Sequence, residues 1–230
     1  YGLKLLGTVN SRRIHCRTLF LAYGFVLHWC EVLQTKPLLR GYEAGISVGY
    51  TDTACWNMYL HLEHSMHLGQ PLEAIAEDLS IYSNQMREFH QQKPYDYSII
   101  LWQAICNLIG DENTSVLTGS VMNETIMLRD AEENQNPHLK ASLRRMQLYV
   151  GVLFGDHDRV MLLLKETKYG QSIEQAMPGV FGLCPMTFLN ALSAFSMYHR
   201  TKRRAYLKIA LALRRKVIKW KDSGVSCAWL

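Results

Sequence analysis

The stretch TDTACWNMYLHLEHSMHLGQPLEAIAEDLSIYSNQMREF, residues 51–89, decides the fold class. Its apolar and aromatic residues recur every three or four positions, first over residues 51–68 and again over residues 71–89, which is the period of an amphipathic α-helix. Gly69 ends the first run, and Pro71 lies at the start of the second, where its missing N–H costs no hydrogen bond. The stretch therefore predicts two antiparallel helices joined by a tight turn.

The same pattern recurs along the chain. The predicted turns fall 34, 41, 45 and 46 residues apart, at Thr35, Gly69, Gly110, Gly155 and Thr201. Five of the six prolines stand where a helix is predicted to open, and no alternating strand pattern of any length occurs. A helical hairpin repeated at such a period is typical of an α-solenoid. We therefore predict an all-α fold, an α-solenoid of antiparallel helix hairpins at residues 13–49, 51–89, 95–133, 137–167 and 185–220.

Three segments carry more specific predictions. Gly41, Gly45 and Gly49 form a four-residue stripe that favours close approach of a neighbouring helix. The less regular segment that follows Asp111 is predicted to hold a short helix at residues 115–119, and residues 169–183 are predicted to be a loop. Because the chain starts with Tyr1 and ends within a helical pattern, we expect residues 1–230 to be one repeat domain of a longer polypeptide.

The composition is that of a globular protein, with 48% apolar and 20% charged residues. The longest apolar run, residues 19–29, is too short to span a bilayer, so no transmembrane helix is expected. The cysteines are scattered and form no CxxC pair. Most of them stand on apolar helical faces, which favours reduced, buried thiols in a cytoplasmic protein over a disulfide framework.

No phosphate-binding GxxxxGK[ST], HExxH or GxSxG motif is present. His61, His64 and His67 form a row, but a step of three residues drifts by about 60° around a helix, so the outer two diverge by about 120°. We therefore expect no metal site, no cofactor and no catalytic residues, and we place these histidines on a polar face or at helix ends. A non-enzymatic role follows.

Positive charge is concentrated near the C-terminus. Residues 200–222 hold ten Lys or Arg against one acid, a local charge of +9, so the net charge of +5 leaves −4 for all other residues. Arg204, Lys208, Arg215 and Lys219 form a stripe opposite an apolar face that runs from Tyr206 to Trp220 in a predicted helix over residues 202–221. A solvated outer face, an acidic protein partner, nucleic-acid phosphates or an anionic membrane would each account for the stripe. No aromatic residue lies on the charged side to stack on bases.

Trp56 and Trp102 lie on helices whose concave side binds peptides in many solenoids, although tryptophan at helical spacing is more often core packing. With Arg204, Lys208, Arg215 and Lys219, they make up the candidate interaction surface.

Two resemblances rest on particular motifs. The segment GQPLEAI, residues 69–75, resembles the inter-helix turn of the tetratricopeptide repeat, although Met58 and Leu62 replace that family's Trp and Gly. GYEAGISVGYTDTA (41–54), LGQPL (68–72) and LWQAICNL (101–108) are similar to the helical region that follows the ATPase module in large predicted-ATPase signalling proteins, many with serine/threonine-kinase and histidine-kinase modules. These resemblances imply a helical scaffold for protein–protein contacts or intramolecular signal relay, with catalysis in other modules. The alternative is a nucleic-acid- or anionic-membrane-binding module that acts through residues 202–221.

Overall fold

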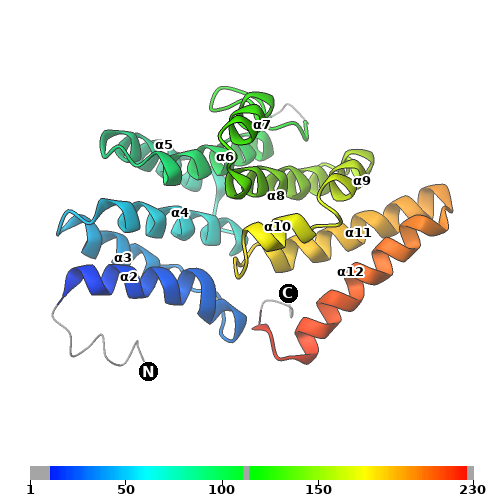
Figure 1. Cartoon of the computed structure of the whole chain (residues 1–230), viewed down its shortest axis with the longest axis horizontal. Coiled ribbons are helices and arrows are strands. Elements are labelled where there is room, and N and C mark those ends of the chain that lie inside the picture. Colours follow the sequence, from blue (N-terminus) through cyan, green and yellow to red (C-terminus); the bar gives the residue numbers. More distant parts are fainter. Residues whose placement is uncertain (1–10, 111–113, 227–230) are drawn as a thin grey trace. The chain divides into compact units, whose positions relative to one another are not determined.

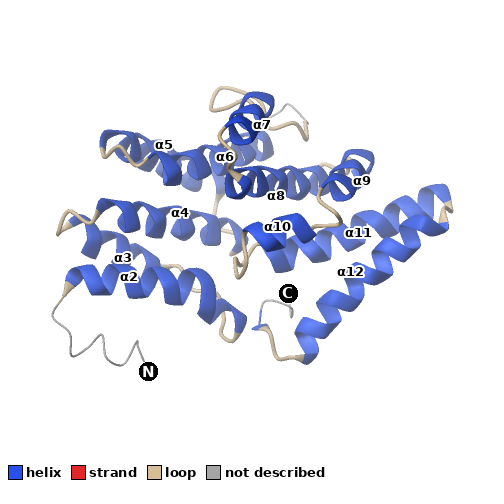
Figure 2. Cartoon of the chain, viewed as in Figure 1, coloured by secondary structure: helices blue, strands red, loops and turns tan. Residues whose placement is uncertain are grey.

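The computed structural model describes residues 11–110 and 114–226. Helices make up nearly all the regular structure there (Figures 1 and 2), and the one β feature is an isolated bridge between Thr118 and Asn123. The prediction of an all-α fold is confirmed. The α-helices are α2 (Arg12–Leu21), α3 (Lys36–Ile46), α4 (Thr51–His67), α5 (Leu72–Glu88), α6 (Gln92–Ile109), α7 (Glu124–Glu133), α8 (Pro137–Leu153), α9 (His157–Glu166), α10 (Gln171–Ala176), α11 (Leu183–Thr201) and α12 (Arg204–Asp222).

The chain forms two compact units, divided within α6 between Trp102 and Gln103. Helices that follow one another in sequence pack together: α2 with α3, α3 with α4 and α4 with α5 in the first unit, and α7 with α8, α8 with α9 and α11 with α12 in the second. These sequential pairs agree with helix hairpins. The finer prediction, that the hairpins stack as a continuous α-solenoid in one domain, stays a prediction.

Helix α4 is the centre of the first unit, with most of its side chains buried. Two glycines of α3 let it approach. A Cβ on Gly41 would lie 2.5 Å from Oδ1 of Asn57, and a Cβ on Gly45 would lie 2.7 Å from Sγ of Cys16. Asn57 uses its amide to donate to the carbonyl oxygens of Cys16 (3.1 Å) and Thr53 (2.9 Å). The predicted role of the glycine stripe in close packing is confirmed for Gly41 and Gly45.

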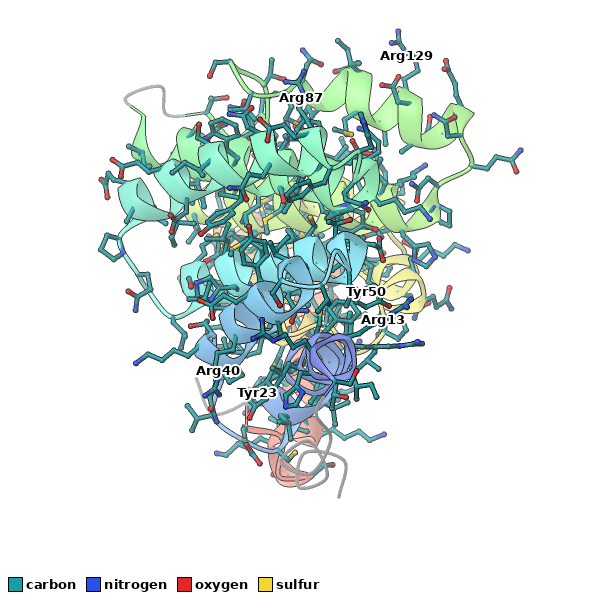
Figure 3. All side chains as sticks on the ribbon, turned by 90° about the vertical axis from the view of Figure 1, so that its left-hand side faces the viewer. Arg13, Tyr23, Arg40, Tyr50, Arg87 and Arg129 are labelled. Carbon is teal, nitrogen blue, oxygen red and sulfur yellow. The ribbon has the colours of Figure 1, made fainter. Side chains whose placement is uncertain are left out.

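The third glycine has a different role. Gly49 has φ +70°, and no atom lies within 4 Å of its notional Cβ, so it serves the turn after α3 and does not pack. The next residue, Tyr50, contacts Arg13 of α2. The guanidinium carbon of Arg13 lies over the Tyr50 ring, 4.5 Å from its centroid (Figure 3). This cation–π contact connects the start of α2 to the turn that precedes α4.

The structure corrects three local predictions. The first helix of the hairpin predicted at residues 13–49 ends at Leu21 and continues as a π-helical turn, Ala22–Val26, and a 3-10 turn, Leu27–Trp29. Gly24 in the π turn lies against Leu60, whose Cδ1 would be 2.6 Å from a Cβ there, so tertiary packing sets the backbone at a residue of low helix propensity.

Residues 115–119 are not helical, because side chains of the second unit bind their backbone groups in place of helical hydrogen bonds. Residues 169–183 are not all loop: α10 (Gln171–Ala176) lies there and packs on α8. Gly170, with φ +86°, makes the reversal before α10, and Ile173 anchors it in the core.

Across residues 11–110 and 114–226, none of the helices combines the length and the apolar character needed to cross a bilayer. The cytoplasmic location stays a prediction.

Candidate interaction surface on helix α12

Helix α12 packs on α11 through one side and leaves the other side open. Ala210 and Leu213 are buried, and Tyr206, Val217 and Trp220 are half-buried, as expected for the apolar face. Lys202, with φ +56°, makes the turn between the two helices, where its N–H donates to the carbonyl oxygen of Tyr198 at 2.8 Å. The two helices form the C-terminal hairpin of the second unit (Figure 1).

The four predicted cations lie on the open side of α12. Arg204, Lys208, Arg215 and Lys219 are all exposed, and at about 100° per residue they fall within an arc of about 60°. No carboxylate in the described part of the chain forms an ion pair with any of the four. The sequence thus placed these residues on one exposed stripe correctly, while their role stays a prediction.

Two other cations of the hairpin, Arg200 and Lys216, are neutralised within the unit. The guanidinium of Arg200 on α11 pairs with Asp158 of α9, N to O 2.5 Å. The ammonium of Lys216 donates to Glu174 of α10 and lies 5.0 Å from the ring centroid of Trp220. Asp158 of α9 and Glu174 of α10 therefore pair with cations outside the stripe, and the four cations of the stripe keep their full charge.

A groove of about 510 Å³ runs beside this stripe. Six α12 residues line it: Ala205, Lys208, Ile209, Ala212, Leu213 and Lys216. The opposite wall includes Tyr169, which precedes α10 and is 48% exposed. Sequence reasoning missed this groove, because its second wall comes from a turn that lies 36 residues before Ala205 and carries no helical period.

No protein-family model matches the chain, and no curated protein or solved structure is significantly similar to it. The resemblances to tetratricopeptide repeats and to the signalling ATPases therefore stay hypotheses. What is established is an all-helical chain whose helices pack largely as sequential pairs.

The two candidate tryptophans belong to the first unit, whereas α12 belongs to the second. Trp56 is half-buried, and its ring meets those of Tyr97 and Tyr59 edge to face, with centroids 5.0 and 5.9 Å away. Trp102 is also half-buried. The Trp56 ring thus takes part in packing between α4 and α6, and an interaction role for either tryptophan stays a prediction.

In the histidine row, His64 is buried, and His61 and His67 are half-buried. His64 is 1% exposed, and its ring centroid is 6.0 Å from that of His28, so the expected position on a polar face is wrong for this residue. His61 shares a hydrogen bond with the carbonyl oxygen of Thr35 through Nδ1, at 3.1 Å. Among the described residues, no group of three His, Cys, Asp or Glu side chains is arranged to hold a metal ion.

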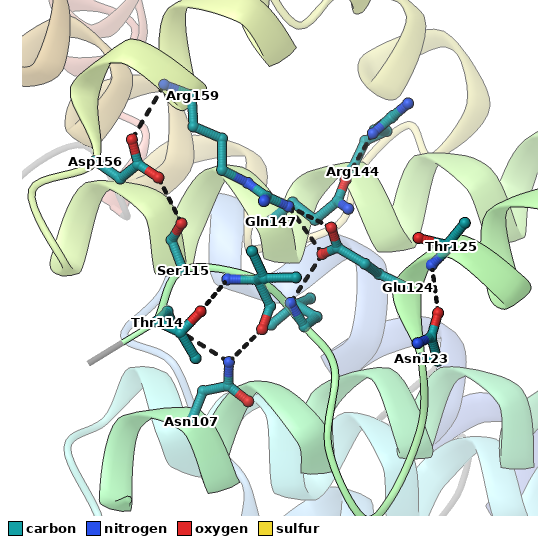
Figure 4. Close-up of polar contacts among 12 residues, drawn as sticks. Asn107, Thr114, Ser115, Asn123, Glu124, Thr125, Arg144, Gln147, Asp156 and Arg159 are labelled. Atoms are coloured by element: carbon teal, nitrogen blue, oxygen red, sulfur yellow. Dashed lines mark hydrogen bonds and ion pairs between the residues drawn. The ribbon is translucent and has the colours of Figure 1, made fainter. Parts of the chain in front are cut away.

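A polar network in the second unit was not predicted (Figure 4). The amide of Asn107 on α6 donates to the carbonyl oxygen of Val116 at 2.6 Å, and the hydroxyl of Ser115 donates to Asp156 at 2.6 Å. Glu124 accepts the backbone N–H of Leu117 at 2.8 Å. These contacts hold residues 114–123 in a non-helical path, and they explain why no helix forms there.

A second cavity, of about 430 Å³, lies between α8, α9 and α10. Two ion pairs flank it, Lys140 with Glu132 (2.6 Å) and Arg144 with Glu166 (2.9 Å). The hydrogen bond and charge of Lys140 lower the pKa of Glu132. Because each charge lining the cavity already has a partner, the cavity offers a ligand no uncompensated charge.

Proposed function

We propose that this chain is a non-catalytic helical scaffold that binds an acidic protein surface through α12. The observation that carries the proposal is the exposed stripe of Arg204, Lys208, Arg215 and Lys219, which no described carboxylate neutralises. Helix hairpins packed in sequence provide a rigid base for such a stripe, as in tetratricopeptide-like α-solenoids. If the chain belongs to a larger signalling ATPase or kinase, as the resemblance implies, the acidic surface belongs to another domain of that protein or to a signalling partner.

Charge complementarity of this kind sets partner choice and association rate more than raw affinity. The stripe is narrow and lies beside an apolar groove, which suits a protein surface with carboxylates next to apolar side chains. A nucleic acid would draw further strength from exposed aromatic rings, but Tyr206 and Trp220 are half-buried on the other face. A membrane surface would need an apolar face free to enter lipid, and that face of α12 packs on α11.

The test compares three anionic probes at physiological salt: polyglutamate, a single-stranded DNA oligonucleotide, and vesicles containing phosphatidylserine. Fluorescence anisotropy and vesicle sedimentation measure binding to the full chain and to a variant with Arg204, Lys208, Arg215 and Lys219 changed to Glu. We expect the variant to lose binding to polyglutamate. Absence of polyglutamate binding by the native chain would overturn the proposal, and tighter binding of DNA or vesicles that the variant abolishes would replace it with the alternative function.

A further inference from the structure

We infer that the groove beside α12 binds an acidic amphipathic α-helix in a register like that of a coiled coil. This inference rests on the proposed function, because it names the partner surface that the cationic stripe recognises.

The spacing on α12 is that of a coiled-coil seam. Ala205, Ile209, Ala212 and Lys216 follow one another at steps of four, three and four residues, and Lys219 continues the pattern. All except Lys219 line the groove. The two alanines are exposed and small, so another helix can approach closely at these points without displacing any side chain. A nineteen-residue helix such as α12 is about 28 Å long, enough for a partner helix of several turns.

The charges select the sign of the partner. With Ile209 and Lys216 at a positions, Lys208 and Arg215 each fall one residue before them, at the g positions that pair with the opposing helix. Both are exposed and unpaired among the described residues. Lys216, within the seam, is held by Glu174 of α10. A partner with glutamates flanking its apolar ridge therefore meets two free cations on one side of the groove.

The opposite wall is held in an unusual conformation. Lys168, Tyr169 and Gly170 are consecutive residues with positive φ, of +49°, +58° and +86°. Only the glycine adopts this left-handed region without steric conflict, and such strain in other residues tends to persist at binding sites. The turn is maintained by a hydrogen bond from the Tyr169 N–H to the carbonyl oxygen of Leu164, at 2.6 Å. It places Tyr169 in the lining of the groove that also contains Ile209.

The test uses a lactam-bridged, monomeric three-heptad peptide with leucines on its ridge and glutamates on both flanks. A peptide of the same length and net charge, in which two prolines replace two uncharged residues, is the non-helical control. Anisotropy measures the binding of both peptides and of polyglutamate to the full chain. We expect the helical peptide to bind at least tenfold more tightly than its broken counterpart.

Two variants test the site. Ala212→Gln fills the groove without changing charge and suits an exposed helical position, so circular dichroism of the variant should match that of the native chain. It should weaken binding of the helical peptide at least tenfold and leave polyglutamate binding unchanged. Lys208→Glu with Arg215→Glu should abolish binding of both probes. The matched control is Arg203→Glu with Arg214→Glu, which makes the same charge change at exposed positions away from the seam, and which should retain most of the affinity.

The outcomes separate this inference from the proposed function. Native affinity of Ala212→Gln for the helical peptide, combined with loss of binding in Lys208→Glu/Arg215→Glu, overturns the groove and leaves the acidic-surface proposal standing. Equal binding of the helical and broken peptides would also overturn the groove and leave the acidic-surface proposal standing. If the native chain binds neither polyglutamate nor the helical peptide, both proposals fail.

Discussion

The guanidinium of Arg159 makes two hydrogen bonds from Nη2 to the carboxylate of Glu124, at 2.6 and 2.8 Å, across 35 residues of sequence. Both side chains are largely buried, with 21% and 12% exposed. The same carboxylate accepts the N–H of Leu117, so the ion pair connects α9, the start of α7 and the segment before it (Figure 4). A pair placed in this way is much harder to break than one on the open surface.

We predict that Arg159→Ala lowers the free energy of unfolding by about 2–4 kcal/mol, because it leaves the Glu124 carboxylate half-desolvated without its cation. Urea denaturation measures the loss, and hydrogen exchange should show residues 114–123 opening first. The matched control is Arg129→Ala, which removes an exposed pair with Glu133 and should cost less than about 0.5 kcal/mol. Equal losses in the two variants would show that the buried pair has no special role.

Close packing of α3 gives a second prediction. Gly45→Ala places a Cβ 2.7 Å from Sγ of Cys16 and 2.8 Å from Cβ of Ala54, and we expect it to destabilise the first unit by about 1–3 kcal/mol. Gly49→Asn is the control, because its site is open and asparagine tolerates a φ of +70°. Thermal unfolding compares the two. A lower midpoint for Gly49→Asn than for Gly45→Ala would contradict the packing argument.

The features that the sequence predicted best are those set by residues close together in the chain. Gly69 and Pro71 fix the end of α4 and the start of α5 by local chemistry. The observed helices, Thr51–His67 and Leu72–Glu88, differ from the predicted runs by no more than one residue at each end. The α12 stripe was predicted for the same reason, because steps of four and seven residues share a helix face whatever the tertiary structure.

The failures have a common physical origin in contacts between distant residues. The π turn at Ala22–Val26 follows from packing of Gly24 against Leu60, and the non-helical path of residues 115–119 follows from side chains of α6, α7 and the turn before α9. Helix α10 has only six residues, too few for a periodic signal, and it depends on the burial of Ile173. Burial of His64 and the second wall of the groove also depend on distant contacts.

Cysteine reactivity should follow burial. Burial raises the pKa of the Cys16 thiol to about 11 and that of Cys55 to about 12, whereas Cys30 is exposed. Because the thiolate is the reactive form, iodoacetamide at pH 8 should label Cys30 and leave Cys16 and Cys55 intact until urea unfolds the chain. Mass spectrometry of tryptic peptides gives the extent of labelling at each site. Rapid labelling of Cys55 in the native protein would show that the region around α4 opens readily.

The same thiols predict how stability depends on pH. Burial raises the pKa of Cys16, of Cys55 and of Tyr42, the last to about 12, so the folded chain keeps these protons at pH values where the unfolded chain has begun to lose them. The unfolded state therefore binds fewer protons above about pH 9, the ordinary value for a thiol, and the linkage relation gives a falling free energy of unfolding. Their stabilising effect is complete below pH 9 and is lost as pH rises towards 12.

Urea denaturation between pH 8 and pH 11 measures this slope. Cys55→Ala removes one titrating group, so its free energy of unfolding should fall less steeply with pH than that of the native chain, although the variant starts from a lower value. Leu79→Ala, at a fully buried position without an ionisable group, should be destabilised by about 2–5 kcal/mol and keep the native slope. If both variants keep the native slope, the Cys55 thiol does not contribute to the alkaline loss of stability. If both flatten it, the change in slope comes from general loosening of the first unit and not from removal of one proton-binding site.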